Sequence, residues 1–371
     1  MPSLGSTRVL RPAIRRAGVL GAAVLALAAC GDDSGSSPPP PPPPLVEGWS
    51  LLAESPTVGE SGHFMDAWFL DASEGWVVGF YGDVYHTGDG GVTWERRHTA
   101  ANGASFFRSV TFVSPSVGWV GDFNDFSRPE PQRALWETRD GGITFTNVTS
   151  KVVGPEPVGI CGLWSVDAST IYGVGRWNGP AVFVRSTDGG ETWQSVSLAP
   201  MMTGAVDVYF FDRMRGIVVG GRGVGSSVEE QNASRTVILT TEDGGSTWTE
   251  RYVGSTTGHW AWKISFPTPQ VGYVATQGPS PDRTVLKTTD GGLTWTEQVV
   301  TRTEDGFAGI GFVTESVGWV GGENVVFETS DGGITWQRAP WGDGESFNRF
   351  RTLAGGAFAI GRRIFKFAPA D

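Results

Sequence analysis

Most of the chain is patterned as short apolar segments, several of which alternate with polar positions. Val84-Tyr85-His86, Val182-Phe183-Val184 and Val237-Ile238-Leu239 are examples. Beyond the N-terminal 30 residues, no segment keeps the 3.6-residue apolar period of an amphipathic helix. The pattern therefore predicts an all-β fold of many short antiparallel strands, with almost no helix.

A repeated turn motif separates the predicted strands. The string Thr-x-Asp-Gly-Gly-x-Thr-Trp occurs six times, with Phe145 replacing the Trp in the second copy and Ser186 replacing the first Thr in the third. Before five of the copies, a Phe stands six places ahead of a glycine that is followed by apolar residues, as Phe112 stands ahead of Gly118. Repeats of this length with four strands each are typical of a β-propeller. The motif aspartates, separated by 51, 48, 55, 47 and 41 residues, are Asp89, Asp140, Asp188, Asp243, Asp290 and Asp331.

The two ends of residues 46–371 predict how the ring closes. Residues 350–353, 357–361 and 363–367 have the pattern of three strands with no motif after them. Residues 48–52 have the pattern of a fourth strand with no unit before it. Combining them gives a seven-bladed β-propeller closed by pairing of the N- and C-terminal strands.

The motif has the chemistry of a hairpin turn. Its carboxylate can accept backbone N–H bonds within the turn, its two glycines can adopt positive φ, and its Trp can pack on the neighbouring blade. We therefore expect the six aspartates to stabilise the fold. A ring of carboxylates that binds metal is the alternative, but the six would lie on separate blades. We expect no metal and no cofactor.

Composition and charge limit the classes of function. The chain has 54 glycines and 16 tryptophans among 371 residues, which fits turn-rich β structure, and its net charge is −11. So acidic a body repels nucleic acid, and we expect none to bind. No phosphate-binding loop or Ser-His-Asp arrangement occurs. The scattered histidines are His63, His86, His98 and His259.

Residues 1–29 have the layout of an export signal, with a basic segment followed by a short apolar run. The run is too short to span a membrane. Leu27-Ala28-Ala29-Cys30 resembles a bacterial lipobox, which implies a lipoprotein signal peptide and acylation of Cys30; an ordinary signal peptide is the alternative. Residues 30–45 would then form a tether, whose seven prolines from Pro38 to Pro44 make a polyproline II spacer of about 22 Å. The other cysteine, Cys161, is expected to be a buried small residue.

With these motifs, the chain resembles the Asp-box, or BNR, repeat proteins, which include sialidases, sortilins, xyloglucanases and the photosystem II assembly and stability factors. The paired pattern Phe-x-x-x-x-x-Gly-Trp-Val-x-Gly and Thr-x-Asp-Gly-Gly-x-Thr-Trp is most similar to the last family and covers residues 46–371. The resemblance implies a seven-bladed propeller without known catalysis that acts as a lumenal or membrane-tethered assembly factor.

We therefore expect an exported, membrane-anchored lipoprotein on the periplasmic or cell-surface side, which binds another protein as a monomer and is not an enzyme. The alternative is a carbohydrate-active, glycosidase-like propeller. It rests on Asp66 and Asp207, which occupy similar first-strand positions in two blades. Their ordinary role would be solvated lining of the central channel. A sialidase would need an arginine triad and a Tyr-Glu pair, and no convincing set is present.

The repeats differ in length mainly in the connections between the second and third strands of a blade. The long connections are residues 122–133, 221–234 and 277–283. These loops are predicted on the face opposite the motifs, and variable loops on a rigid scaffold commonly carry recognition. We expect the partner to bind there, plain channel lining being the alternative. The candidate binding residues are Arg108, Trp260, Trp262, Lys263, Arg349 and Arg351.

Overall fold

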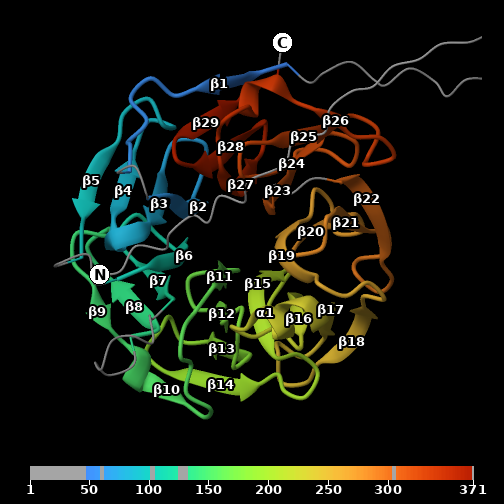
Figure 1. Cartoon of the computed structure of the whole chain (residues 1–371). Coiled ribbons are helices and arrows are strands. Elements are labelled where there is room, and N and C mark those ends of the chain that lie inside the picture. Colours follow the sequence, from blue (N-terminus) through green and yellow to red (C-terminus); the bar gives the residue numbers. More distant parts are fainter. Residues whose placement is uncertain (1–46, 59–61, 101–104, 124–132, 303–305, 370–371) are drawn as a thin grey trace, which may run out of the picture. The chain divides into compact units, whose positions relative to one another are not determined.

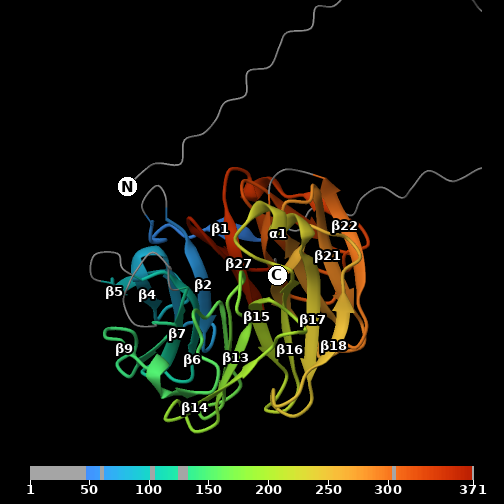
Figure 2. The same ribbon diagram turned by 60° about the horizontal axis from the view of Figure 1, so that its bottom comes forward.

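The computed structural model describes residues 47–58, 62–100, 105–123, 133–302 and 306–369. Seven sheets follow one another around a ring, each with its first strand at the central channel and its last strand outside (Figures 1 and 2). The predicted signal peptide at 1–29, the acylated Cys30 and the tether at 30–45 lie outside the described residues. In the part that the structure describes, no helix is long and apolar enough to cross a membrane.

The first three blades share a set of four antiparallel strands, numbered along the chain, to which the third blade adds a fifth strand described below. They are β2 (Phe64–Phe69), β3 (Gly75–Gly79), β4 (Val84–Thr87) and β5 (Glu95–His98); β6 (Phe107–Phe112), β7 (Gly118–Asp122), β8 (Leu135–Thr138) and β9 (Thr146–Asn147); and β11 (Gly162–Ser165), β12 (Ile171–Gly175), β13 (Val182–Ser186) and β14 (Trp193–Ser197).

The next three blades repeat the arrangement. They are β15 (Gly204–Phe210), β16 (Gly216–Arg222), β17 (Arg235–Thr241) and β18 (Thr249–Val253); β19 (Trp260–Ser265), β20 (Gly272–Gln277), β21 (Asp282–Thr288) and β22 (Thr296–Arg302); and β23 (Phe307–Phe312), β24 (Gly318–Gly322), β25 (Val326–Thr329) and β26 (Gln337–Arg338). Short helices occur only in connections of the described chain: η1 (Phe80–Gly82), η3 (Thr149–Lys151), α1 (Val228–Ala233) and η4 (Pro340–Gly342).

The seventh blade joins both ends of the propeller. Strands β27 (Phe347–Leu353), β28 (Gly356–Gly361) and β29 (Ile364–Phe367) are completed by β1 (Trp49–Leu51). Strand β1 runs antiparallel to β29, with Trp49 opposite Phe367 and Leu51 opposite Phe365. The predicted seven-bladed, all-β propeller and its closure are therefore confirmed.

The spacing between Phe and Gly in the repeat has a packing cause. Phe112 and Gly118 are partners across β6 and β7, and a Cβ atom on Gly118 would lie 2.6 Å from the Phe112 ring. The missing side chain leaves room for the ring, which then stacks on Trp76 of the preceding blade with centroids 3.8 Å apart. Tyr172 stacks on Phe210 in the same way, at 3.5 Å. The repeat thus builds the contacts between blades.

The prediction of four strands per blade is wrong in one place. The third blade has a fifth strand, β10 (Val152–Val153), which pairs in parallel with the outer strand β14. It forms because the chain leaving the second blade passes along this exposed edge and pairs with its free backbone groups.

The two ends of the propeller differ. The six Asp-Gly-Gly turns join the third and fourth strands of their blades, and we call the end they occupy the motif face. The connections between second and third strands lie at the opposite end, which we call the mouth face. Helix α1 belongs to the mouth face, between β16 and β17, and begins with a capping box formed by Ser227 and Glu230. Residues 221–234 and 277–283 therefore lie where the sequence predicts; most of residues 122–133 are outside the described chain.

Candidate functional site

The Asp-Gly-Gly turns form a closed set of hydrogen bonds. In the fifth copy, Asp290 accepts from the Thr294 backbone N–H at 2.9 Å and from the Thr294 hydroxyl at 2.6 Å. The Thr288 hydroxyl donates to Asp290 at 2.8 Å and accepts from the Gly292 N–H at 2.9 Å. Gly292 has φ of +92°, which an L side chain rarely adopts. Such bonds lower the pKa of Asp290 and Asp331. In the other four copies they hold the pKa of the carboxylate at about 2, at Asp89, Asp140, Asp188 and Asp243.

Asp290→Ala is expected to lower the free energy of unfolding by about 1 kcal/mol. The Thr294 N–H loses its acceptor, but the turn is exposed, so a hydrogen bond to water replaces part of the lost energy. Urea unfolding measures the change, and Thr289→Ala in the same turn is the control. The variant should still capture a partner when folded. If capture were lost at unchanged stability, the turn would be a binding site rather than scaffold.

A group of charged side chains is buried in the central channel, and we call it the channel ion cluster. It consists of Asp66, Asp207, Lys263, Arg349 and Arg351, which come from strands β2, β15, β19 and β27. Arg349 bridges the two acids, with Nε 3.1 Å from Asp66 and Nη1 2.5 Å from Asp207. Arg351 donates to Asp66 at 3.0 Å, and Lys263 Nζ lies 3.8 Å from Asp207.

Burial of the channel ion cluster corrects two expectations. Asp66 and Asp207 are each 1% exposed, so they are not solvated channel lining. Both carboxylates form ion pairs with buried arginines, and Arg349 together with Lys263 keeps the pKa of Asp207 below its usual range despite burial. A glycosidase acid needs a raised pKa and access to the sugar. These two carboxylates do not form such a pair.

Lys263, Arg349 and Arg351, three of the candidate binding residues, are buried within the channel ion cluster. The carboxylates that pair with them lie on first strands of other blades. Sequence position put them on the channel-lining strands but could not show how deep in the channel they lie.

Lys263 predicts a pH dependence of stability. Burial lowers its pKa from 10.5 to about 8 in the folded protein, while Asp207 opposes the shift. Between pH 8 and pH 10 the unfolded chain therefore holds a proton that the folded protein has lost. The free energy of unfolding should rise with pH in this window, on the order of 2 kcal/mol.

Urea unfolding of the wild type and of Lys263→Met at pH 7, 8, 9 and 10 checks this expectation. The difference in stability between the two proteins should grow in favour of the wild type above pH 8 and stay constant below it. Parallel curves over the whole range would contradict a lowered pKa of Lys263.

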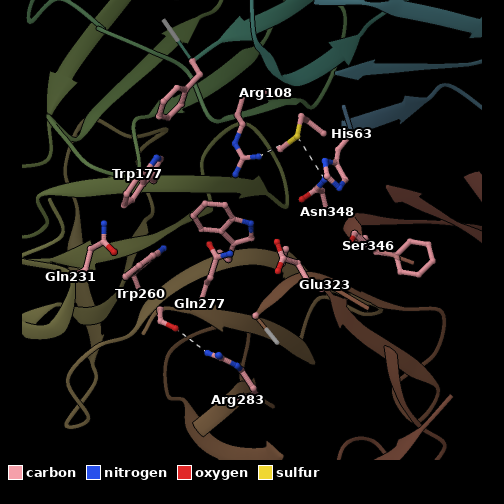
Figure 3. Close-up of a pocket in the computed structure, with 18 of the residues that line it drawn as sticks. His63, Arg108, Trp177, Gln231, Trp260, Gln277, Arg283, Glu323, Ser346 and Asn348 are labelled. Atoms are coloured by element: carbon pink, nitrogen blue, oxygen red, sulfur yellow. Dashed lines mark hydrogen bonds between the residues drawn. The ribbon is translucent and has the colours of Figure 1, made fainter. Parts of the chain in front are cut away.

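A pocket of about 680 Å³ opens on the mouth face, and we call it the mouth pocket. First-strand starts and second-to-third connections of several blades line it, so it is the open end of the channel (Figure 3). Its principal lining residues are His63, Met65, Phe80, Phe106, Arg108, Phe123, Trp177, Gln231, Trp260, Trp262, Arg283 and Glu323.

The six candidate residues therefore fall into two groups. Arg108, Trp260 and Trp262 line the mouth pocket, whereas the other three belong to the channel ion cluster. Sequence reasoning missed Trp177, which lies in the connection after β12 and stacks on Trp260 with centroids 5.6 Å apart. The sequence did offer a signal for Trp177. It directly follows Gly175-Arg176 and precedes the turn residues Asn178-Gly179-Pro180, so it is an aromatic residue in a connecting loop.

Cys161 is fully buried and free, as expected of a small core residue. Burial raises the pKa of its thiol, and Arg108 beside it opposes the shift. A protonated thiol is a poor nucleophile. In the described part of the chain, no group of three His, Cys, Asp or Glu side chains could hold a metal ion.

Comparison with known proteins agrees with the repeat. The model of the BNR/Asp-box repeat matches residues 184–195. A curated relative, the photosystem II assembly lipoprotein Ycf48 of Nostoc sp., is 31% identical over 89 residues, which are 24% of this chain and 26% of that protein. The match thus spans about a quarter of the relative's length.

Solved structures show the same fold over most of the chain. The structure described as "YCF48 bound to D1 peptide" superposes with a TM-score of 0.63 at 18% identity, covering 89% of this chain and 99% of that one. A GH74 xyloglucanase from Xanthomonas campestris gives a TM-score of 0.57 at 15% identity, covering 84% of this chain and 52% of that one. At such identities the likeness concerns the fold alone. Together with the six turns and seven blades, these matches identify the chain as an Asp-box repeat β-propeller that resembles the photosystem II assembly factor family.

Proposed function

We propose that this protein is an exported, lipid-anchored propeller that binds another protein through the mouth pocket and acts as an assembly or stability factor. The observation that carries the proposal is the mouth pocket itself, an aromatic hollow with a buried arginine. Tryptophan and arginine in a desolvated pocket are the residues that dominate protein interfaces. The similar Nostoc protein is named an assembly lipoprotein, and a solved structure of the same fold holds a peptide.

The course of the chain supports this orientation. Third strands run from the mouth face to the motif face, and Phe367 is the last residue of the third strand β29. Trp49 pairs with Phe367, so the described chain begins at the motif face. Residue 47, where the described chain begins, therefore lies at the end of the propeller opposite the mouth pocket.

Photo-crosslinking tests which face the partner meets. A photoreactive p-benzoylphenylalanine is placed at Gln231 on the rim of the mouth pocket, and at Ile334, which is 76% exposed on the motif face, as the matched control. Irradiation of cells should give a discrete crosslinked protein from Gln231 and none from Ile334. Crosslinks from Ile334 alone would move the interface to the motif face and refute the proposal.

The anchor is tested separately on the same protein. Mass spectrometry of the mature chain should find an acylated Cys30 at its N-terminus, and Cys30→Ser should release the protein from the membrane fraction. A mature chain that begins elsewhere without lipid would exclude the anchor while leaving the binding proposal to the crosslinks.

A further inference from the structure

Arg108 in the mouth pocket is a buried cation without a carboxylate partner. Its side chain comes from β6 and is 5% exposed. Nη1 donates a weak hydrogen bond, 3.6 Å from the Met65 sulfur (Figure 3), and the guanidinium also interacts with the Cys161 side chain. The guanidinium carbon lies 4.7 Å from the centre of the Trp262 ring. In the described part of the chain no carboxylate forms an ion pair with it, and burial lowers the pKa of its guanidinium. Burying such a charge is costly unless an anion joins it.

Two tryptophans of the mouth pocket, one of them in contact with Arg108, have indole N–H groups without a hydrogen bond to any described residue. Trp260 and Trp262 are 5% and 7% exposed, and neither Nε1 has an acceptor among the described residues. Buried indole N–H groups normally find a hydrogen-bond partner. Trp260 and Trp262 therefore each bring an indole N–H without an acceptor in the described chain to the lining of the mouth pocket.

The pocket's acid does not neutralise this site. Glu323 lies on the rim and is exposed to water, and in the described chain it forms no ion pair with Arg108. Arg283, the other arginine of the lining, donates to the Gly278 and Ser280 carbonyl groups at 2.9 and 2.8 Å. Arg108 is therefore the cation whose hydrogen-bonding capacity points to a ligand.

We propose that the mouth pocket binds a carboxylate carried on an apolar body, with the carboxylate at Arg108 and the apolar body against the aromatic lining. A carboxylate carries one negative charge, which one guanidinium balances, and its two oxygens match the guanidinium fork. A phosphate would bring nearly two charges into a pocket with a single unpaired arginine. The volume of about 680 Å³ accommodates a few residues of chain or a small organic acid.

Two sources supply this chemistry, the C-terminal residue of a partner protein and a free small acid. The first rests on the proposed function and gives the partner a defined end to insert. Both share the carboxylate on an apolar group, so the test must separate them.

Calorimetric titration of the detergent-solubilised full-length protein tests the site. The probes are the peptide N-acetyl-Gly-Ser-Leu-Phe as the free acid, the same peptide as its C-terminal amide, and 3-phenylpropanoate. The variants are Arg108→Gln, which removes the charge, and Trp260→Phe, which keeps an aromatic ring and removes the donor. Arg235→Gln is the matched control, since Arg235 is exposed and begins β17 at the mouth face.

The free acid should bind the wild type at least tenfold more tightly than the amide. Arg108→Gln should abolish this ratio, Trp260→Phe should reduce it, and Arg235→Gln should leave it unchanged. Binding of 3-phenylpropanoate as tight as that of the peptide acid would support the site and assign it to a free acid; weaker binding would assign it to a chain end.

Three results would overturn the inference: equal affinity of acid and amide, a ratio that survives Arg108→Gln, or no heat from the free acid at 10 mM. Crosslinks from Gln231 that persist in an Arg108→Gln background would then show that the protein-binding proposal stands without the carboxylate site. Absence of Gln231 crosslinks from the wild type, with the free acid still preferred to the amide, would show that the carboxylate site stands without the protein-binding proposal.

Discussion

Deletion of residues 47–52 is expected to destabilise the propeller more than any single change in a turn. Strand β1 supplies the outer strand of the seventh blade, and without it β29 becomes an unpaired edge. Trp49 also stacks on Trp341 with centroids 4.4 Å apart and meets Trp319 edge to face at 5.0 Å. Trp49→Ala alone should cost about 3 kcal/mol, the lower end for truncation of a large aromatic residue.

Thermal unfolding and light scattering measure both effects. The deleted protein should melt at a lower temperature and aggregate, whereas Ser50→Ala, which changes an exposed side chain of the same strand, should behave as the wild type. A deletion variant with the same melting temperature as the wild type would mean that the stability of the ring does not depend on this strand.

Asp207→Ala is expected to destabilise the protein by about 3–5 kcal/mol, because it removes the carboxylate that pairs with the buried Lys263 and leaves the buried Arg349 with Asp66 alone. Arg349 loses its 2.5 Å contact, and Lys263 loses the nearest carboxylate of the described residues. The effect exceeds that of Asp290→Ala, since the Asp290 turn is exposed and water replaces its bonds.

The double variant Asp207→Ala, Lys263→Met separates charge from packing. Removal of the lysine charge should recover part of the lost stability, because the buried ammonium without a carboxylate is then gone and Arg349 still pairs with Asp66. Urea unfolding at pH 7 provides the measurement. If Asp207→Ala cost less than 1 kcal/mol, or if the double variant were less stable than the single one, the cluster would not be held by these ion pairs.

The features that the sequence predicts well are those that depend on residues close together along the chain. The Thr288-to-Thr294 turn needs only neighbours in the chain, so its hydrogen bonds follow from the motif. The closure of the ring could also be predicted from the sequence. One end of the propeller has a single strand with no repeat before it, and the other end has a repeat that lacks its fourth strand. Local pattern was enough in both cases.

The ion pairs in the central channel could not be predicted in the same way. Asp66 and Arg351 are separated by 285 positions yet pair at 3.0 Å, and residue type alone does not show that they meet. Alternation marks both as residues of channel-lining strands, but their depth depends on how the first strands tilt against one another. Arg108 lies nearer the opening, and this difference in depth separates a pocket residue from a member of the channel ion cluster.

Trp177 was missed for a related reason. It lies in a connection rather than on a first strand, and only the fold brings it against Trp260 of another blade. Loop residues that converge over a channel are invisible to a search along strands.

Amide hydrogen exchange of the free protein and of its purified complex tests the central claim most directly, namely that the partner binds the mouth face. Peptides covering residues 222–235 and 277–283 should exchange more slowly in the complex, while those covering the Asp-Gly-Gly turns, such as residues 289–294, should exchange equally in both. Slower exchange confined to the Asp-Gly-Gly turns would contradict it.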